Sequence, residues 1–136
     1  MTQEDKELLL KDLCARLDTN LVCSIYRIDD YGVGYRDEIF SGYCKGDIWD
    51  EFYFGDDCGI GIDNVSKIKP YLFPLSSMTE EQKAELMELM YKADTPFGAI
   101  FSENIDYFDW LNKHHFDYRG LIEKGLAIDA TGLNVY

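Results

Sequence analysis

The chain has 136 residues and a formal net charge of −13, and it is long enough to bury a core without disulfides or metal ions. A hydrophobic content of 46% excludes a disordered acidic tail. The excess of acid argues against direct binding to nucleic-acid backbones or anionic membranes, because both need Lys and Arg. We expect one domain over residues 1–136, with a basic partner, a cation or plain solubility as the reason for the charge.

The cysteines and the N-terminus predict a cytoplasmic protein. Cys14, Cys23, Cys44 and Cys58 form no C-x-x-C pair and lack zinc-ligand spacing. The first ten residues are acidic and contain no basic segment of the kind that opens a signal peptide. No apolar run approaches the length of a membrane span. We therefore expect reduced thiols, no bound metal and no cofactor.

The first third of the chain predicts a helix followed by two strands. Thr2–Leu17 has a possible N-cap, early acids and an apolar stripe at helical spacing. Leu21–Ile28 is rich in β-branched and aromatic residues, as strands are. Asp29 to Gly32 is expected to turn the chain into a second strand, Val33–Phe40, which Ser41-Gly42 ends.

Two further strands are expected before residue 64. Asp47–Phe54 combines acids with aromatic residues, and Cys58–Asp63 is a shorter candidate after the turn at Gly55. Four short strands joined by tight turns predict an antiparallel meander, or a sheet partly curled into a small barrel.

The next segment is expected to change from irregular chain to helix. Val65–Pro74 contains two prolines and predicts irregular structure with one short helical turn. Thr79 and Gln82 match a capping box, in which each side chain satisfies a free backbone donor of the other residue. The helix that they open is expected to end near Asp94-Thr95-Pro96.

The C-terminal quarter is expected to be helical. Phe97–Phe101 predicts a last strand or a buried loop, and Ser102 or Asn104 then caps a helix that runs to about Lys113. A short helix is expected at Tyr118–Lys124, ending at Gly125. The fold class is thus α+β: an N-terminal helix, a small antiparallel sheet of three to five strands and a helical C-terminal half.

Three segments together carry a resemblance to known proteins: KDLCARL at Lys11–Leu17, KPYLFPLSSMTEEQK at Lys69–Lys83 and FDWLNKHHFDYRGLIEKGLAID at Phe108–Asp129. They resemble an uncharacterised family of small proteins from phages, prophages and mobile elements of gut bacteria. The resemblance covers the N-terminal helix and most of the second half. It implies a phage- or host-associated setting and no assigned reaction, cofactor or catalytic residue.

The two histidines are the first candidates for chemistry. His114 and His115 are adjacent, and neighbours on a helix point about 100° apart, so both cannot readily bind one metal ion. The spacing of H-E-x-x-H is also missing. We expect one imidazole to pack among Phe108, Leu111 and Tyr118 and the other to cap the helix end.

Asp117 and Arg119 offer an acid and a base within three residues. An Asp just before a helix is most simply its N-cap, here for the segment that starts at Tyr118. Arg119 could bind an anion, but in so acidic a chain it is expected to pair with a neighbouring Asp.

The acidic strands are the better candidate for a binding surface. Between Asp29 and Asp63 there are ten acidic residues and two basic ones, which is well over half of the net charge. This run is either a solvated sheet face or a surface for a basic partner or cation. Strand alternation should expose one set of the aromatic side chains beside the acids. The predicted binding residues are Trp49, Asp50, Glu51, Phe52 and Tyr53.

These features predict a non-enzymatic binding or regulatory protein that uses an acidic and aromatic surface on a protein partner. One alternative is an acidic mimic of nucleic acid that inhibits a basic host protein. Another is a metal-assisted hydrolase that uses His114 and His115 with nearby Asp residues. No catalytic residue is assigned.

Overall fold

An open sheet of six strands forms the centre of the molecule, with the order β3-β2-β1-β4-β5 and with β6 paired to β4. The computed structural model describes all residues except 31, 49, 56–61, 63 and 92–98, and the side chains of 90, 91 and 99–105 also lie outside the description. The elements are α1 (Gln3–Ala15), β1 (Val22–Asp29), β2 (Gly32–Cys44), β3 (Glu51–Phe54), η1 (Val65–Lys67), β4 (Ile68–Pro74), η2 (Leu75–Ser77), α2 (Glu80–Tyr91), α3 (Ala99–Lys113), β5 (Phe116–Asp117) and β6 (Ile128–Asp129).

The predicted α+β class with an N-terminal helix is confirmed. The partly curled barrel and the wholly antiparallel sheet of three to five strands are wrong, because the described residues form an open, mixed sheet of six strands. Pairing among β1, β2, β3 and β4 is antiparallel, and β5 and β6 each pair with β4 in parallel. The sheet is open because its strands do not pair round into a closed ring. Within the described residues, no helix is long and apolar enough to cross a membrane.

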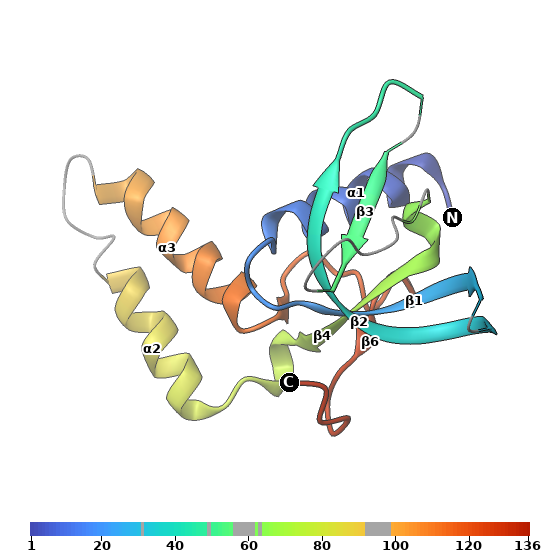
Figure 1. Cartoon of the computed structure of the whole chain (residues 1–136). Helices are drawn as coiled ribbons and strands as arrows, with labels where there is room; N and C mark the ends of the chain where they lie inside the picture. Colours follow the sequence, from blue (N-terminus) through green and yellow to red (C-terminus); the bar gives the residue numbers. More distant parts are fainter. Residues whose placement is uncertain (31, 49, 56–61, 63, 92–98) are drawn as a thin grey trace.

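Helix α1 covers one face of the sheet (Figure 1). Thr2 and Asp5 form a capping box at its start, which satisfies two backbone donors that a helix leaves free. Leu9 and Leu13 are fully buried in the main core cluster, together with Cys23 and Ile25 of β1. The predicted apolar stripe is therefore the docking face of the helix.

Strands β1 and β2 form the predicted hairpin, paired from Val22 opposite Ile39 to Asp29 opposite Gly32. The break expected at Ser41-Gly42 is wrong, because β2 continues to Cys44. The register shifts between Phe40 and Gly42, so that Ser41 is an extra residue in the ladder with β3. Such a bulge bends a strand without ending it.

The irregular segment expected at Val65–Pro74 is also wrong beyond η1, because β4 lies between β1 and the two parallel strands. Pro70 pairs with Cys23 and is buried. Phe40 donates its N–H to the carbonyl of Leu21, so the backbone groups of Leu21 point toward β2. In an antiparallel ladder every second residue does the same, so the N–H and C=O groups of Cys23 also point toward β2. Cys23 therefore needs no hydrogen bond from Pro70, and the missing N–H costs the β1–β4 ladder nothing.

Two corrections concern the helical C-terminal half. The strand or buried loop expected at Phe97–Phe101 gives way, where the chain is described, to α3 from Ala99. The helix expected at Tyr118–Lys124 is a turn. Gly120 has a φ of 75°, which lies outside the helical region and interrupts a helix there. The predicted left-handed Gly125 is confirmed by its φ of 71°.

Helices α2 and α3 lie side by side and project away from the sheet (Figure 1). Thr79 and Gln82 make the predicted capping box at the start of α2. A second apolar cluster joins this helical hairpin to β5. Its buried members are Met78, Leu86, Leu111 and Phe116. The expected stop of α2 at Asp94-Thr95-Pro96 lies outside the described residues, as does most of the expected strand Cys58–Asp63. Ile62, which is described, bridges to Phe52.

The hydroxyl of Tyr136 stands between β1 and β4. It accepts a hydrogen bond from the N–H of Val22 (3.2 Å) and donates one to the carbonyl of Tyr71 (2.7 Å). Continuing the register from Cys23 and Pro70 would place Val22 opposite Tyr71. The phenol thus bridges the two strands at the position where direct pairing stops.

We expect Tyr136→Phe to destabilise the protein by about 1 kcal/mol, because two backbone groups lose a hydrogen-bond partner. Urea unfolding followed by circular dichroism measures this change. Tyr35→Phe is the matched control, since the side chain of Tyr35 is exposed on the sheet surface. Equal midpoints for Tyr136→Phe and wild type would contradict a bridging role.

Candidate functional site

The sheet face that lies opposite α1 is uncovered over the β1–β2 hairpin. Alternation directs Cys23 and Ile25 into the core and their neighbours to the other side. Cross-strand pairs on that side join aliphatic and aromatic residues, and the register brings Ile28 beside Val33. We call this surface the open face. Its exposed large hydrophobic side chains and their exposed fractions are Ile28 (73%), Val33 (65%), Tyr35 (68%) and Ile39 (44%).

Two carboxylates on the open face are held by tyrosine phenols. Tyr71 donates to Asp37 over 2.9 Å, and Tyr53 donates to Glu51. Burial and the bond to Asp37 raise the pKa of Tyr71, while the bond to Glu51 is the main cause that raises the pKa of Tyr53. Both phenols are thus protonated donors at neutral pH, and their hydrogen bonds hold the two carboxylates in place.

The predicted site at Trp49–Tyr53 is divided between two sides of β3. Phe52 is buried in the core, so it cannot be an exposed contact. Glu51 and Tyr53, which alternate with it, are half-buried on the open face. Asp50 precedes the strand and accepts a hydrogen bond from Tyr43 (2.9 Å). Burial and this bond raise the pKa of Tyr43 to about 12. Trp49 lies outside the described residues.

Several acids of the predicted run are already paired. Arg36 contacts Asp29 at 2.7 Å, and Arg27 contacts Glu38 at the same distance. These four residues belong to the side of the hairpin that faces away from Tyr35 and Asp37, as their register shows. The acids of the run are therefore split between two faces and partly neutralised.

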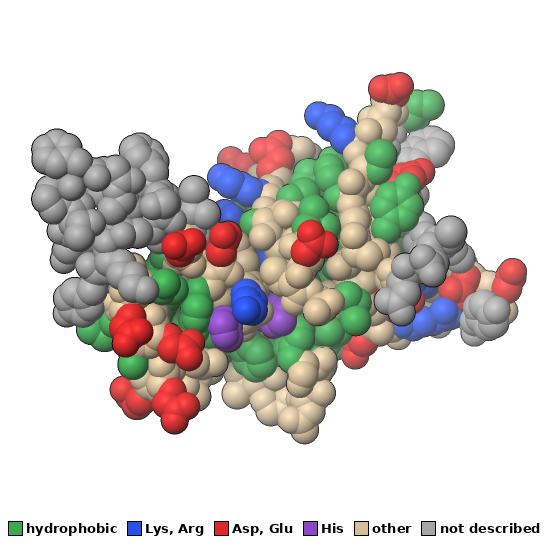
Figure 2. Space-filling view, turned by 60° about the vertical axis from the view of Figure 1, so that its left-hand side comes forward, with side chains coloured by type: hydrophobic (Ala, Val, Ile, Leu, Met, Phe, Trp, Pro, Cys, Tyr) green, Lys and Arg blue, Asp and Glu red, His purple; other side chains and the backbone are tan. Residues whose placement is uncertain are grey.

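The histidines lie where the helical hairpin meets the sheet (Figure 2). A ring nitrogen of His114 lies 2.9 Å from the carbonyl of Trp110, and the two rings stack. His115 adopts a φ of 62° and places Nε2 2.8 Å from the carbonyl of Thr19. Its ring stacks on that of Tyr136, at 3.8 Å between centroids. The rings that stack on the imidazoles are thus those of Trp110 and Tyr136, which were not among the expected neighbours Phe108, Leu111 and Tyr118.

Among the described residues, neither imidazole meets a set of acids that would hold a metal ion. In the described ranges, no three His, Cys, Asp or Glu side chains come together in a way that could bind one. Each imidazole has a backbone carbonyl within hydrogen-bond distance and an aromatic ring against it. These contacts fit a structural role at the end of α3.

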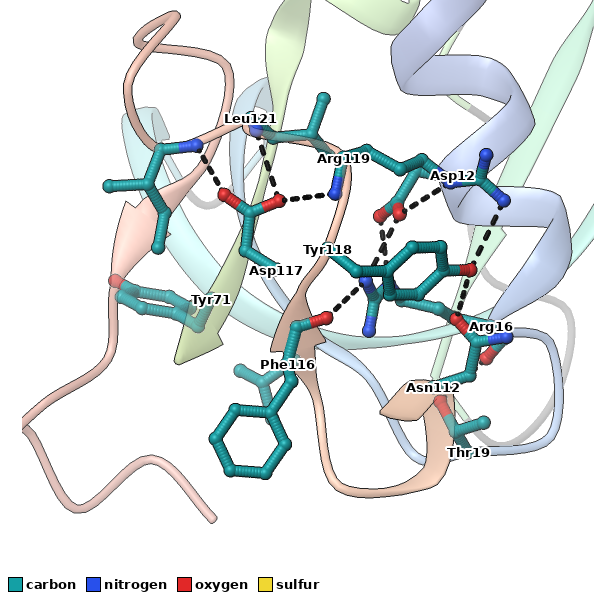
Figure 3. A network of polar contacts seen from close by, with 12 residues as sticks. Asp12, Arg16, Thr19, Tyr71, Asn112, Phe116, Asp117, Tyr118, Arg119 and Leu121 are labelled. Atoms are coloured by element: carbon teal, nitrogen blue, oxygen red, sulfur yellow. Dashed lines mark hydrogen bonds and ion pairs between the residues drawn. The ribbon is translucent and has the colours of Figure 1, made fainter. Parts of the chain in front are cut away.

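A buried polar network links α1 to the chain after α3 (Figure 3). Asp12 receives two hydrogen bonds from Arg16, at 2.8 and 3.0 Å, and a third from Arg119 at 3.2 Å. Arg16 also donates to the carbonyl of Phe116. The expected pairing of Arg119 with a neighbouring Asp is corrected: its partner is Asp12, far away in the sequence.

Asp117 acts as the predicted cap, although it caps a turn. Its carboxylate accepts backbone hydrogen bonds from Arg119, Leu121 and Ile122. Arg119 also stacks over Tyr118, with 4.8 Å from the guanidinium carbon to the ring centroid. Asp117 and Arg119 therefore make structural contacts within the fold.

No protein-family model, curated protein or solved structure matches this chain.

We expect Asp12→Ala to cost about 3–5 kcal/mol of stability, because it leaves the buried guanidinium of Arg16 without its counter-charge. Chemical unfolding measures the loss. Lys83→Ala is the control, since it removes an ion pair with Glu80 at the surface and should change little. Similar effects of the two substitutions would contradict a dependence of the fold on the buried pair.

The stability of the protein should fall in mild acid because of His115. Burial lowers the pKa of this imidazole, and the nearby Arg16 and His114 lower it further. The contribution of the neutral ring is complete above the unfolded-state pKa of about 6.5 and is lost as the pH falls below that value toward the folded-state pKa. Unfolding free energies measured at pH 7.5, 6.5 and 5.5 test this.

His115→Asn is the variant for comparison, because Asn tolerates a positive φ and does not titrate. Its stability should decline less than that of wild type between pH 6.5 and 5.5. Parallel pH profiles for the two proteins would show that His115 does not set the dependence.

Proposed function

We propose that this chain is a non-enzymatic binding protein that uses its open face on a protein partner. The observation that carries the proposal is the group of exposed hydrophobic side chains on the β1–β2 hairpin, namely Ile28, Val33, Tyr35 and Ile39. Scattered apolar residues are common on protein surfaces, but a contiguous group with polar edges is typical of interaction sites. The family resemblance adds a phage or mobile-element setting to the proposal.

The charge of the open face suggests what the partner looks like. Asp37 lies between Tyr35 and Ile39 on this face, Glu51 lies on the neighbouring strand β3, and the whole chain carries a net charge of −13. A partner with an apolar centre and basic residues around it would match both features. Tyr35 is the expected central contact, because a large aromatic residue with a polar tip commonly dominates such interfaces.

Mimicry of nucleic acid is the second candidate. It needs acids at regular spacing on one exposed face, since phosphate groups are regularly spaced. Asp29 and Glu38 instead form ion pairs on the side that faces away from Asp37. The apolar residues at the centre of the open face therefore favour ordinary protein binding over mimicry.

Substitution of the open face should weaken the partner complex. A partner captured from host lysate would be purified and titrated with Tyr35→Ala and with Met87→Ser, which changes an exposed hydrophobic residue on α2. We expect Tyr35→Ala to lower the affinity about tenfold or more and Met87→Ser to leave it unchanged. Equal affinities of both variants and wild type would place the interface elsewhere.

The salt dependence of the affinity, measured in the same titration, distinguishes ordinary protein binding from mimicry of nucleic acid. Binding through the apolar centre should weaken modestly between low and high salt, whereas mimicry should lose affinity steeply. Asp50→Asn and Trp49→Ala would be measured alongside, because both positions belong to the predicted binding segment.

A further inference from the structure

A groove of about 230 Å³ lies between the first half of α1 and the start of β3. Its apolar lining comes from Leu10, Phe52 and Val65, and the charged groups at its rim are Lys6, Glu7 and Asp50. Two residues of the predicted binding segment therefore contribute to one concave surface. Phe52, which cannot be an exposed contact, lines it with a side chain that is almost fully buried.

The walls of the groove are held in place by their own contacts. Phe52 packs against Tyr43, with 5.2 Å between ring centroids, and Val65 begins η1 after the cap made by Asn64. Asp50 accepts a hydrogen bond from the hydroxyl of Tyr43, and this bond fixes the carboxylate at the rim. A site that is already ordered loses little entropy when a ligand enters.

The chemistry of the rim favours a cation over an anion. Two carboxylates, those of Glu7 and Asp50, stand against the single ammonium of Lys6. Each carboxylate can accept several hydrogen bonds. Asp50 accepts one from Tyr43 and Glu7 accepts one from Gln3, and these bonds occupy only part of that capacity. The overall net charge of −13 also draws cations toward the molecule.

The size of the groove limits the class of ligand further. Pockets that enclose drug-sized molecules or cofactors usually have volumes of about 300–1,000 Å³. At about 230 Å³, this groove suits one long side chain. Arg and Lys combine an apolar stem with a charged head, which matches an apolar lining below a carboxylate rim.

We propose that the groove binds an arginine or lysine side chain of the partner protein. The stem would lie against the partly exposed Leu10, above the nearly buried Phe52 and Val65, and the cationic head would meet Glu7 and Asp50. This inference rests on the proposed function, since the side chain belongs to the partner, but the groove can be tested without that partner.

The probe is n-butylguanidinium, which reproduces the end of an arginine side chain, and n-butylurea is its neutral counterpart. In a titration of the ¹⁵N-labelled protein followed by NMR, the cation should cause saturable shifts at the amides of Leu10, Phe52 and Val65. The urea should bind about two- to fivefold more weakly, because it loses the attraction of the carboxylates. Equal responses to both probes would overturn the proposal.

Charge-neutral variants test the roles of the two acids. Asp50→Asn and Glu7→Gln should each weaken binding of the cation by about two- to fivefold, as expected for partly exposed ion pairs. Glu4→Gln removes an acid from the same helix outside the groove and should leave the affinity unchanged. Amide spectra of the free variants confirm that each is folded. Unchanged affinity in both groove variants would overturn the proposal.

Tyr35→Ala distinguishes a failure of the groove from a failure of the proposed function. This variant should bind n-butylguanidinium as wild type does, because Tyr35 does not line the groove. If it loses the partner but the groove does not recognise the cation, only the groove assignment is wrong. If the groove binds the cation selectively while Tyr35→Ala keeps the partner, the open face is wrong and the groove assignment holds.

Discussion

The fold depends on a charged pair that has no access to solvent. Asp12 and Arg16 lie one helical turn apart on α1, and both are fully buried. Removing two charges from water is costly unless their remaining hydrogen-bonding capacity is satisfied. Arg119 donates to Asp12 and the carbonyl of Phe116 accepts from Arg16, while the buried Nη1 of Arg16 has no hydrogen-bond partner among the described residues. A helix at the start of the chain is therefore completed by a segment about a hundred residues later.

That constraint explains why the end of the chain is built from turns and short strands. The carbonyl of Phe116 must reach Arg16 while β5 pairs with β4, and Asp117 then satisfies the backbone donors of the turn that follows. The turn directs Leu121 into the main core. The irregular segment after residue 117 therefore satisfies these backbone donors with the Asp117 carboxylate instead of with helical carbonyls.

Sequence patterns predicted the elements whose signals are local. The N-cap at Thr2, the capping box at Thr79 and the first hairpin needed only neighbouring residues. Strand β4 was missed because Pro70 argues against a central strand, and only the alternation of the ladder shows that its missing N–H is harmless. The Asp12–Arg16 pair was missed because the same spacing is usual for exposed ion pairs on helices.

The candidate site shows the same limit, because periodicity does not say which strand face is covered. Val33, Tyr35 and Ile39 have the alternation of a core face, yet they are exposed. An apolar hairpin of this kind invites pairing between copies of one chain. The charge opposes this, since two molecules that each carry −13 repel one another at low salt. Repulsion between like charges thus opposes self-association through the apolar surface, and it would not oppose the basic partner that we propose.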